Sequence, residues 1–167
     1  MRTPMKLHIK YLTIIIALFL LQSCGSSADT TKIAETKALI EIREFKIEHD
    51  WLNPMAGGRI NLIGNPNFIR FKNDSVNLFL PFFGERFSGG GYNSEGGIIY
   101  EGPLQDFEIS SGRNNSQVIK FSTDQDTENL NFTINIYPEG DVSTRVNSSQ
   151  RSFISYQGKI GELKEED

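Results

Sequence analysis

Short alternating runs of apolar and polar residues, separated by turn residues, fill the chain from Glu44 onward. The clearest run is EFKIEHDW (Glu44–Trp51), in which every second residue is apolar or aromatic. A period of two predicts a half-buried β-strand. Its predicted inward residues are Phe45, Ile47, His49 and Trp51. Further strand-like runs cover residues 75–82, 117–122, 130–137, 142–147 and 152–160.

The runs and the Gly, Pro, Asn and Asp turns between them predict about nine strands at hairpin spacing. No helical stretch between them is long enough for the crossovers that parallel strands require, so the sheet should be antiparallel. We expect an all-β fold, an antiparallel meander curled into a barrel-like or half-barrel sheet, with a β-sandwich as the alternative. The single β-rich domain is predicted to span residues 32–161, followed by an acidic tail at 162–167.

One segment before the strands has a different composition. TKIAETKALIEI (Thr31–Ile42) is rich in Ala, Leu, Lys and Glu and contains neither Gly nor Pro. These residues favour a short amphipathic helix, with Ile33, Leu39 and Ile40 among its apolar positions. We expect this helix to pack against an opening or an edge of the sheet.

The amino terminus has the features of an export signal. Arg2, Lys6 and Lys10 precede the apolar run Tyr11–Leu21, which is too short to cross a bilayer and is typical of a signal peptide. Leu21-Gln22-Ser23-Cys24 resembles the lipobox of bacterial lipoproteins, in which the cysteine becomes the acylated first residue. We therefore predict a signal peptide at 1–23, a lipid-attachment site at Cys24 and a flexible tether over 24–31.

The predicted mature chain is acidic and has no second cysteine. Removal of the signal leaves 14 basic residues against 21 acidic ones, a net charge of −7. This charge argues against a nucleic-acid partner. The membrane contact is instead expected to run through the acylated Cys24. Because Gly25 is not an obvious inner-membrane retention residue, we expect a cell-envelope location in the outer membrane, facing the periplasm.

Three motifs in order resemble a known family. They are NPMAGGRINL (Asn53–Leu62), LPFFGERF (Leu80–Phe87) with Tyr92 beyond it, and ISYQGKI (Ile154–Ile160). Together they are similar to the Gram-negative envelope proteins grouped as domain of unknown function 4251. The resemblance implies a location in the cell envelope and a probable fold. It implies no catalytic residue, because the family has no established activity.

The residues for common catalytic schemes are few. In the predicted mature chain His49 is the only histidine, and the only thiol belongs to Cys24. Nucleophilic triads and zinc sites built from several His and Cys ligands are therefore not expected. Because His49 lies between Ile47 and Trp51 on the apolar face, we interpret it as a core or rim histidine. We expect neither a metal nor another cofactor.

Carboxylates form two small groups. Asp124, Asp126 and Glu128 have the spacing that begins a calcium loop, but Asn129 and Asn135 occupy the positions of the turn glycine and the distal glutamate. Glu48 and Asp50 share the polar face of the first strand and would form a glycosidase pair only inside a cleft. Separately, Asp74-Ser75-Val76 resembles a short O-glycosylation signal of exported proteins, at a predicted turn.

A glycine-rich segment, SGGGYNSEGG (Ser88–Gly97), fits neither phosphate-loop pattern and precedes no helix. We interpret it as a mobile loop between two strands that forms a rim of the sheet. The aromatic residues beside it are the candidate binding residues of this rim. They are Phe82, Phe83, Phe87 and Tyr92.

Two function classes follow from these features. The first is a non-catalytic binding module that holds an apolar ligand or an envelope protein on its concave face or its loop rim. A structural lipoprotein without a small ligand is an equal variant of this class. The second class is a carboxylate-dependent hydrolase acting on an envelope glycan, which rests only on the acidic pairs. We favour the first class.

Overall fold

The computed structural model describes residues 27–87, 96–125 and 128–164. The chain divides into Met1–Thr31 and Lys32–Asp167, and every strand lies in the second unit. Within the described residues one α-helix, α2 (Ser27–Ile42), precedes the strands. The strands are β1 (Glu44–Pro54), β2 (Ile60–Asn61), β3 (Phe68–Lys72), β4 (Ser75–Pro81), β5 (Gly97–Pro103), β6 (Gln105–Ser111), β7 (Gln117–Gln125), β8 (Glu128–Ile136), β9 (Asp141–Ser148) and β10 (Ile154–Glu162). A short 3₁₀ turn, Arg113–Asn115, joins β6 to β7.

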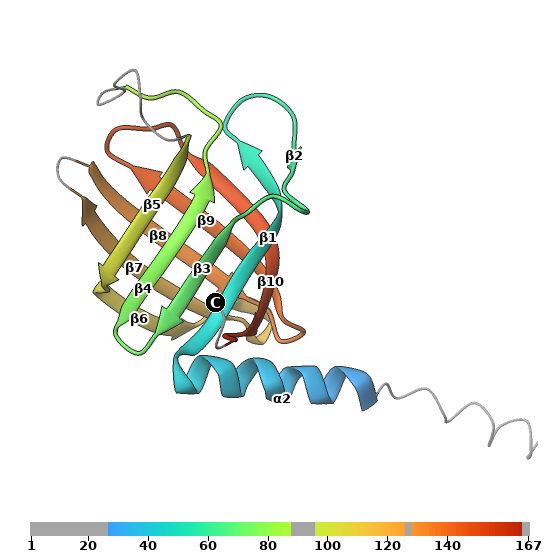
Figure 1. Ribbon diagram of the computed structural model, residues 1–167. Helices are drawn as coiled ribbons and strands as arrows, with labels where there is room; N and C mark the ends of the chain where they lie inside the picture. Colours follow the sequence, from blue (N-terminus) through green and yellow to red (C-terminus); the bar gives the residue numbers. More distant parts are fainter. Residues whose placement is uncertain (1–26, 88–95, 126–127, 165–167) are drawn as a thin grey trace, which may run out of the picture. The chain divides into compact units, whose positions relative to one another are not determined.

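The strands form one ten-stranded antiparallel sheet that nearly closes into a barrel (Figure 1). Its order is β5-β4-β3-β1-β10-β9-β8-β7-β6, and β2 pairs with β1 beside this path. Only Leu104 separates the two edge strands β5 and β6 along the chain. The chain therefore passes from one edge of the sheet to the other within a single residue. The predicted all-β, barrel-like meander is confirmed.

The first strand follows the predicted alternation only as far as His49. Phe45, Ile47 and His49 point inward and are buried, but Leu52 rather than Trp51 continues the buried row. The register with β10 shifts between His49 and Trp51, which is the signature of a β-bulge. The prediction that Trp51 faces inward is wrong, because the extra residue of the bulge turns it to the outer face.

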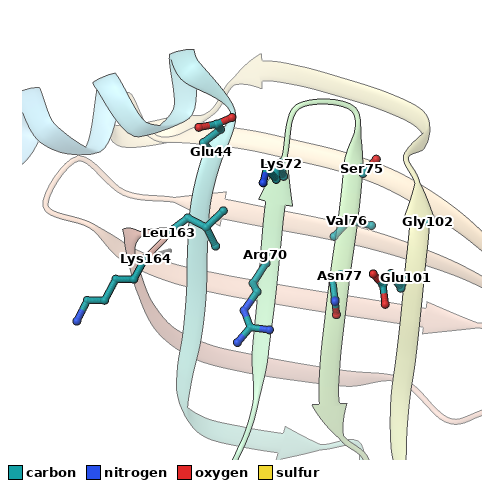
Figure 2. Close-up of a pocket in the computed structure, with 10 residues that line it drawn as sticks. All are labelled: Glu44, Arg70, Lys72, Ser75, Val76, Asn77, Glu101, Gly102, Leu163 and Lys164. Atoms are coloured by element: carbon teal, nitrogen blue, oxygen red, sulfur yellow. The ribbon is translucent and has the colours of Figure 1, made fainter. Parts of the chain in front are cut away.

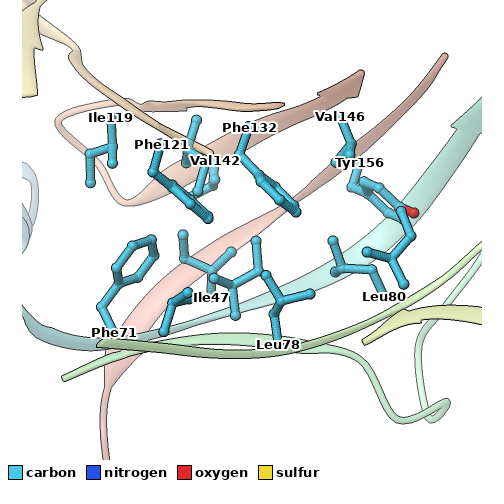
Figure 3. Packing of buried hydrophobic residues seen from close by; sticks show 14 of the residues in the cluster. Ile47, Phe71, Leu78, Leu80, Ile119, Phe121, Phe132, Val142, Val146 and Tyr156 are labelled. Atoms are coloured by element: carbon cyan, nitrogen blue, oxygen red, sulfur yellow. The ribbon is translucent and has the colours of Figure 1, made fainter. Parts of the chain in front are cut away.

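An aromatic row fills the interior of the barrel (Figure 3). Ring centroids are 4.7 Å apart for Phe45 and Phe71, 5.5 Å for Phe71 and Phe121, and 4.5 Å for the stacked pair Phe121 and Phe132. These residues come from β1, β3, β7 and β8, so the row joins opposite walls of the barrel. Core side chains therefore occupy the concave face, which was one of the two predicted ligand surfaces.

The helix begins at Ser27, four residues before the predicted start at Thr31. Ser and Asp are favoured at helix amino termini, so the small polar residues there are compatible with a helix start as well as a tether. Within the unit that holds the strands, Thr36 and Ile40 are buried and Leu39 is partly buried against the core. Ile33, predicted as part of the apolar face, is exposed. The buried face of the helix is narrow, because its buried residues Thr36 and Ile40 form a single i, i+4 row.

Candidate functional site

The predicted rim residues have different environments. Phe82 is buried against the core cluster, whereas Phe83 is 50% exposed and Phe87 is 67% exposed. Tyr92 lies outside the described residues. Phe83 and Phe87 are therefore the two predicted rim residues that the structure leaves open for contact, while Phe82 fixes their segment to the barrel.

The segment that carries these residues is held by backbone pairing. Arg86 forms an antiparallel bridge with Arg151, which lies in the turn between β9 and β10. The Phe87 N–H donates to the Gln150 carbonyl at 2.7 Å, and the Ser152 N–H donates to the Glu85 carbonyl at 2.9 Å. This short ladder gives the aromatic segment a defined backbone conformation at one end of the barrel.

An ion pair between Arg151 and Glu128 stabilises the same end of the barrel. Arg151 donates from Nε and from a terminal nitrogen to the two carboxylate oxygens of Glu128, each at 2.7 Å. Its other terminal nitrogen donates to the Gly97 carbonyl at 2.8 Å, and its guanidinium lies 5.3 Å from the ring centroid of Phe82. The two charged side chains are only 10% and 14% exposed. Arg151 thus connects β8, the start of β5 and the aromatic segment.

The electrostatics of Glu128 fit this bracing role. Burial raises the pKa of its carboxyl group, but hydrogen bonds from Arg151 and Ser148 and the charge of Arg151 outweigh that effect and lower the pKa overall. The carboxylate is therefore ionised at neutral pH and fully engaged by protein donors. This pair could not be predicted from local sequence patterns, because 23 residues separate its members.

Exposed apolar residues gather where this segment meets the ends of two strands. Pro54, the last residue of β1, pairs with Ile154, the first residue of β10. Their outer neighbours Met55 and Phe153 are exposed. Together with the two exposed phenylalanines of the paired segment they form what we call the aromatic end. Its members are Met55, Phe83, Phe87 and Phe153.

His49 is a core residue, as the sequence indicated. It is 2% exposed, its Nε2 lies 2.9 Å from the Thr144 hydroxyl, and its ring centroid is 5.2 Å from that of Tyr156. The Asn67 side chain accepts from the His49 backbone N–H and donates to its carbonyl, at 2.7 and 3.0 Å. Burial lowers the pKa of His49 to about 4, so the imidazole is neutral at pH 7.

The acidic pair of β1 lies on the outer face of the sheet. Glu48 and Asp50 both line a groove of about 610 Å³ over β1 and β10. The side chain of Glu48 is 65% exposed and its carboxylate lies 3.0 Å from Lys46 Nζ. A general acid of a glycosidase is typically a buried carboxyl group, and Glu48 lacks that burial.

Two of the three possible calcium ligands, Asp124 and Glu128, are hydrogen-bonded to other side chains. Asp124 accepts a hydrogen bond from the Asn129 side chain, and Glu128 is bound by Arg151. Asp126 lies outside the described residues. In the part of the chain that the structure describes, no group of three or more His, Cys, Asp or Glu side chains could hold a metal ion.

A further groove of about 530 Å³ runs over the outer face of β3, β4 and β5 (Figure 2). Its walls carry charges of both signs, including Arg70, Lys72 and Glu101. Ser75, in the possible O-glycosylation signal, is exposed at its edge, and Asp74 pairs with Arg43 at 3.2 Å. Ser75 therefore has the exposure that a modified residue requires.

The fold and these surfaces define a small antiparallel β-barrel protein with a packed interior. Its accessible polar, charged and aromatic side chains lie on the outer surface. The chain belongs to the family described as domain of unknown function DUF4251, whose model matches residues 27–160. It is similar to the crystal structure of a DUF4251 family protein from Bacteroides eggerthii DSM 20697. That likeness has a TM-score of 0.63 and 14% sequence identity, and covers 81% of this chain and 91% of the other. No curated protein matches the sequence.

No helix within residues 27–87, 96–125 and 128–164 is long and apolar enough to cross a membrane.

Proposed function

We propose that this protein is a lipid-anchored component of the Gram-negative cell envelope and acts as a non-catalytic binding module. Acylated Cys24 holds it in the outer membrane, facing the periplasm. The aromatic end of the barrel binds a protein partner in the envelope. The family contributes no activity to this proposal, because its function is unknown.

The anchor is supported by the order of features at the amino terminus. A basic segment, an apolar run and a small polar stretch surround the only cysteine of the chain. Each buried methylene contributes about 0.8 kcal/mol to membrane binding, so two acyl chains or more give a stable attachment. The anchor also gives the lone Cys24 a role in a chain that has no second cysteine for a disulfide.

The observation that carries the binding role is the exposure of large apolar side chains on a braced backbone. Phe83 and Phe87 are half and two-thirds exposed, yet their segment is fixed by a ladder and by Arg151. Exposed phenylalanines on a rigid frame can bind with little loss of conformational entropy. Contiguous exposed apolar surface commonly marks a protein interface.

A protein partner fits the structure better than an enclosed small ligand. The aromatic row fills the barrel interior, so an apolar ligand would need to displace core side chains. The aromatic end is instead an exposed surface built from three chain segments. Aromatic residues and Met are enriched in the cores of protein interfaces.

In-cell photocrosslinking tests this role. We would place a photoreactive phenylalanine analogue at Phe87 and, as a matched control, at Ile42, which is 59% exposed at the end of α2. We expect one discrete crosslinked protein from position 87 and none from position 42. In a chain that also carries Phe83→Ser, the product should fall at least about fivefold, since burying one such side chain contributes about 1.5–3 kcal/mol.

Other outcomes of the crosslinking experiment would contradict this role. Absence of a discrete product from position 87, or equal products from both positions, contradicts binding at the aromatic end. A product that is lost in a Glu48→Gln chain but kept in the Phe83→Ser chain would favour the acidic face of β1 and the hydrolase alternative.

A further inference from the structure

The bulge in β1 gives the outer face of the barrel an aromatic centre. Trp51, the only tryptophan, is turned outward and pairs in register with Gln157 of β10, which in turn pairs with Ser143 of β9. Gly158 permits this geometry, because a Cβ there would lie 1.9 Å from the Glu48 carbonyl oxygen. A residue with a side chain at that position would force the two strands apart and disturb the bulge.

Trp51 is part of a preorganised group of side chains. The Arg59 guanidinium lies 4.1 Å from the centroid of the indole ring, and a terminal nitrogen donates to Gln157 Oε1 at 2.7 Å. Arg59 comes from the loop between β1 and β2, so it reaches back over β1 to make both contacts. Stacking and hydrogen bonding fix the plane of the guanidinium, whose remaining N–H groups are available as donors.

These side chains line one wall of a groove of about 480 Å³ over β1, β10 and β9. Tyr137 adds a second aromatic ring, and Ser143 adds a hydroxyl group. Arg145 provides a second guanidinium, and two carboxylates also line the groove. They belong to Asp50 and Asp141.

The chemistry of the lining selects among ligand classes. The two arginines and the two aspartates balance in formal charge, which argues against a phosphate or another simple anion as the ligand. Planar amide, guanidinium and carboxylate groups offer paired donors and acceptors. The phenol ring offers an apolar face, and the indole ring offers apolar surface beside the guanidinium of Arg59. A sugar ring presents the complementary set, with adjacent hydroxyls at its edge and C–H groups on its faces. The volume also lies in the range of small-ligand sites.

We propose that this groove binds a neutral saccharide. The ring packs against Trp51 and Tyr137, while Gln157, Arg145 and the aspartates bond its hydroxyl groups. This site lies on the wall of the barrel and is separate from the aromatic end, so it does not depend on the protein partner proposed above. The envelope contains abundant glycans, which the tethered module would then contact.

The fluorescence of the chain provides a direct test, because its only tryptophan lies in the groove. We would titrate the full chain, in a detergent without a sugar headgroup, with maltotriose and separately with the trisaccharide of N-acetylglucosamine. We expect a saturable change for at least one of them, with a dissociation constant on the order of 1 mM. If only the second binds, the acetamido group is part of the recognition.

Two variants complete the test. Arg145→Ala should weaken binding about tenfold or more, as expected for the loss of a hydrogen bond to a charged group. Asn147→Ala changes an exposed residue on the same face of β9 outside the groove and should leave the affinity unchanged. Absence of a saturable change with both sugars overturns the proposal. Equal affinities of the parent and the Arg145→Ala chain also overturn it.

Discussion

His49 shows how one residue can look catalytic in sequence and be structural in the fold. It is the sole histidine of the predicted mature chain, but it lies in the core against Tyr156 and Thr144. The sequence predicted this position, because His49 shares the inward face of a strand with Ile47. The role of Asn67, which bonds both backbone groups of His49, could not be predicted from a residue 18 positions away.

Burial of His49 predicts a specific dependence of stability on pH. Its pKa is about 4 in the folded chain and 6.5 when unfolded, so between these values the unfolded state binds more protons. The contribution of His49 is therefore complete above about pH 6.5 and is lost as the pH falls towards 4. It amounts to about 3 kcal/mol. Urea unfolding of the parent and of His49→Gln across this range measures it.

In the His49→Gln chain the free energy of unfolding should fall less steeply between pH 6.5 and 4, because this proton is no longer taken up on unfolding. The carboxylates, Glu128 among them, titrate in both chains and cancel in the comparison. Equal slopes in the two chains would show that His49 is not held neutral by burial.

At the scale of the elements, β1 determines which surfaces the protein presents. Its alternation predicted a strand, but a strictly alternating strand cannot bury both His49 and Leu52. The adjacent apolar pair Trp51-Leu52 was the signal in the sequence that the alternation must break. Where the extra residue falls depends on Gly158 in the partner strand, which is far away in the chain. Local patterning therefore predicted the strand but not the direction of Trp51.

The two glycines of β10 provide a matched test of the bulge. At Gly158 an added Cβ would lie 1.9 Å from a backbone oxygen, whereas at Gly161 it would meet nothing within 4 Å. We expect Gly158→Ala to lower the free energy of unfolding by about 3 kcal/mol or more, because backbone must move. Gly161→Ala should change it by less than about 1 kcal/mol. Thermal unfolding of both variants checks this difference, and equal melting temperatures would contradict the described β1–β10 register.

At the scale of the whole molecule, the antiparallel meander and the approximate number of strands, about nine predicted against ten in the sheet, could be predicted because they depend on local alternation and turn residues. The order of the strands around the barrel could not, since it rests on the pairing of β1 with β10 and on the passage from β5 to β6 at Leu104. The candidate sites could likewise be predicted only where their residues lie close together in the sequence. Phe83 and Phe87 were predicted as neighbours in the chain, whereas the Arg151–Glu128 and Trp51–Gln157 pairs depend on long-range pairing.

The proposal that the whole protein works as a tethered module depends on Cys24, and intact-mass spectrometry tests that residue most directly. The protein would be extracted from the membrane fraction with mild detergent and measured without proteolysis. We predict a chain that begins at Cys24 and carries about two or three acyl chains, and a Cys24→Ser variant that lacks this added mass. An unmodified Cys24, or a chain that begins at another residue, would contradict the lipid anchor.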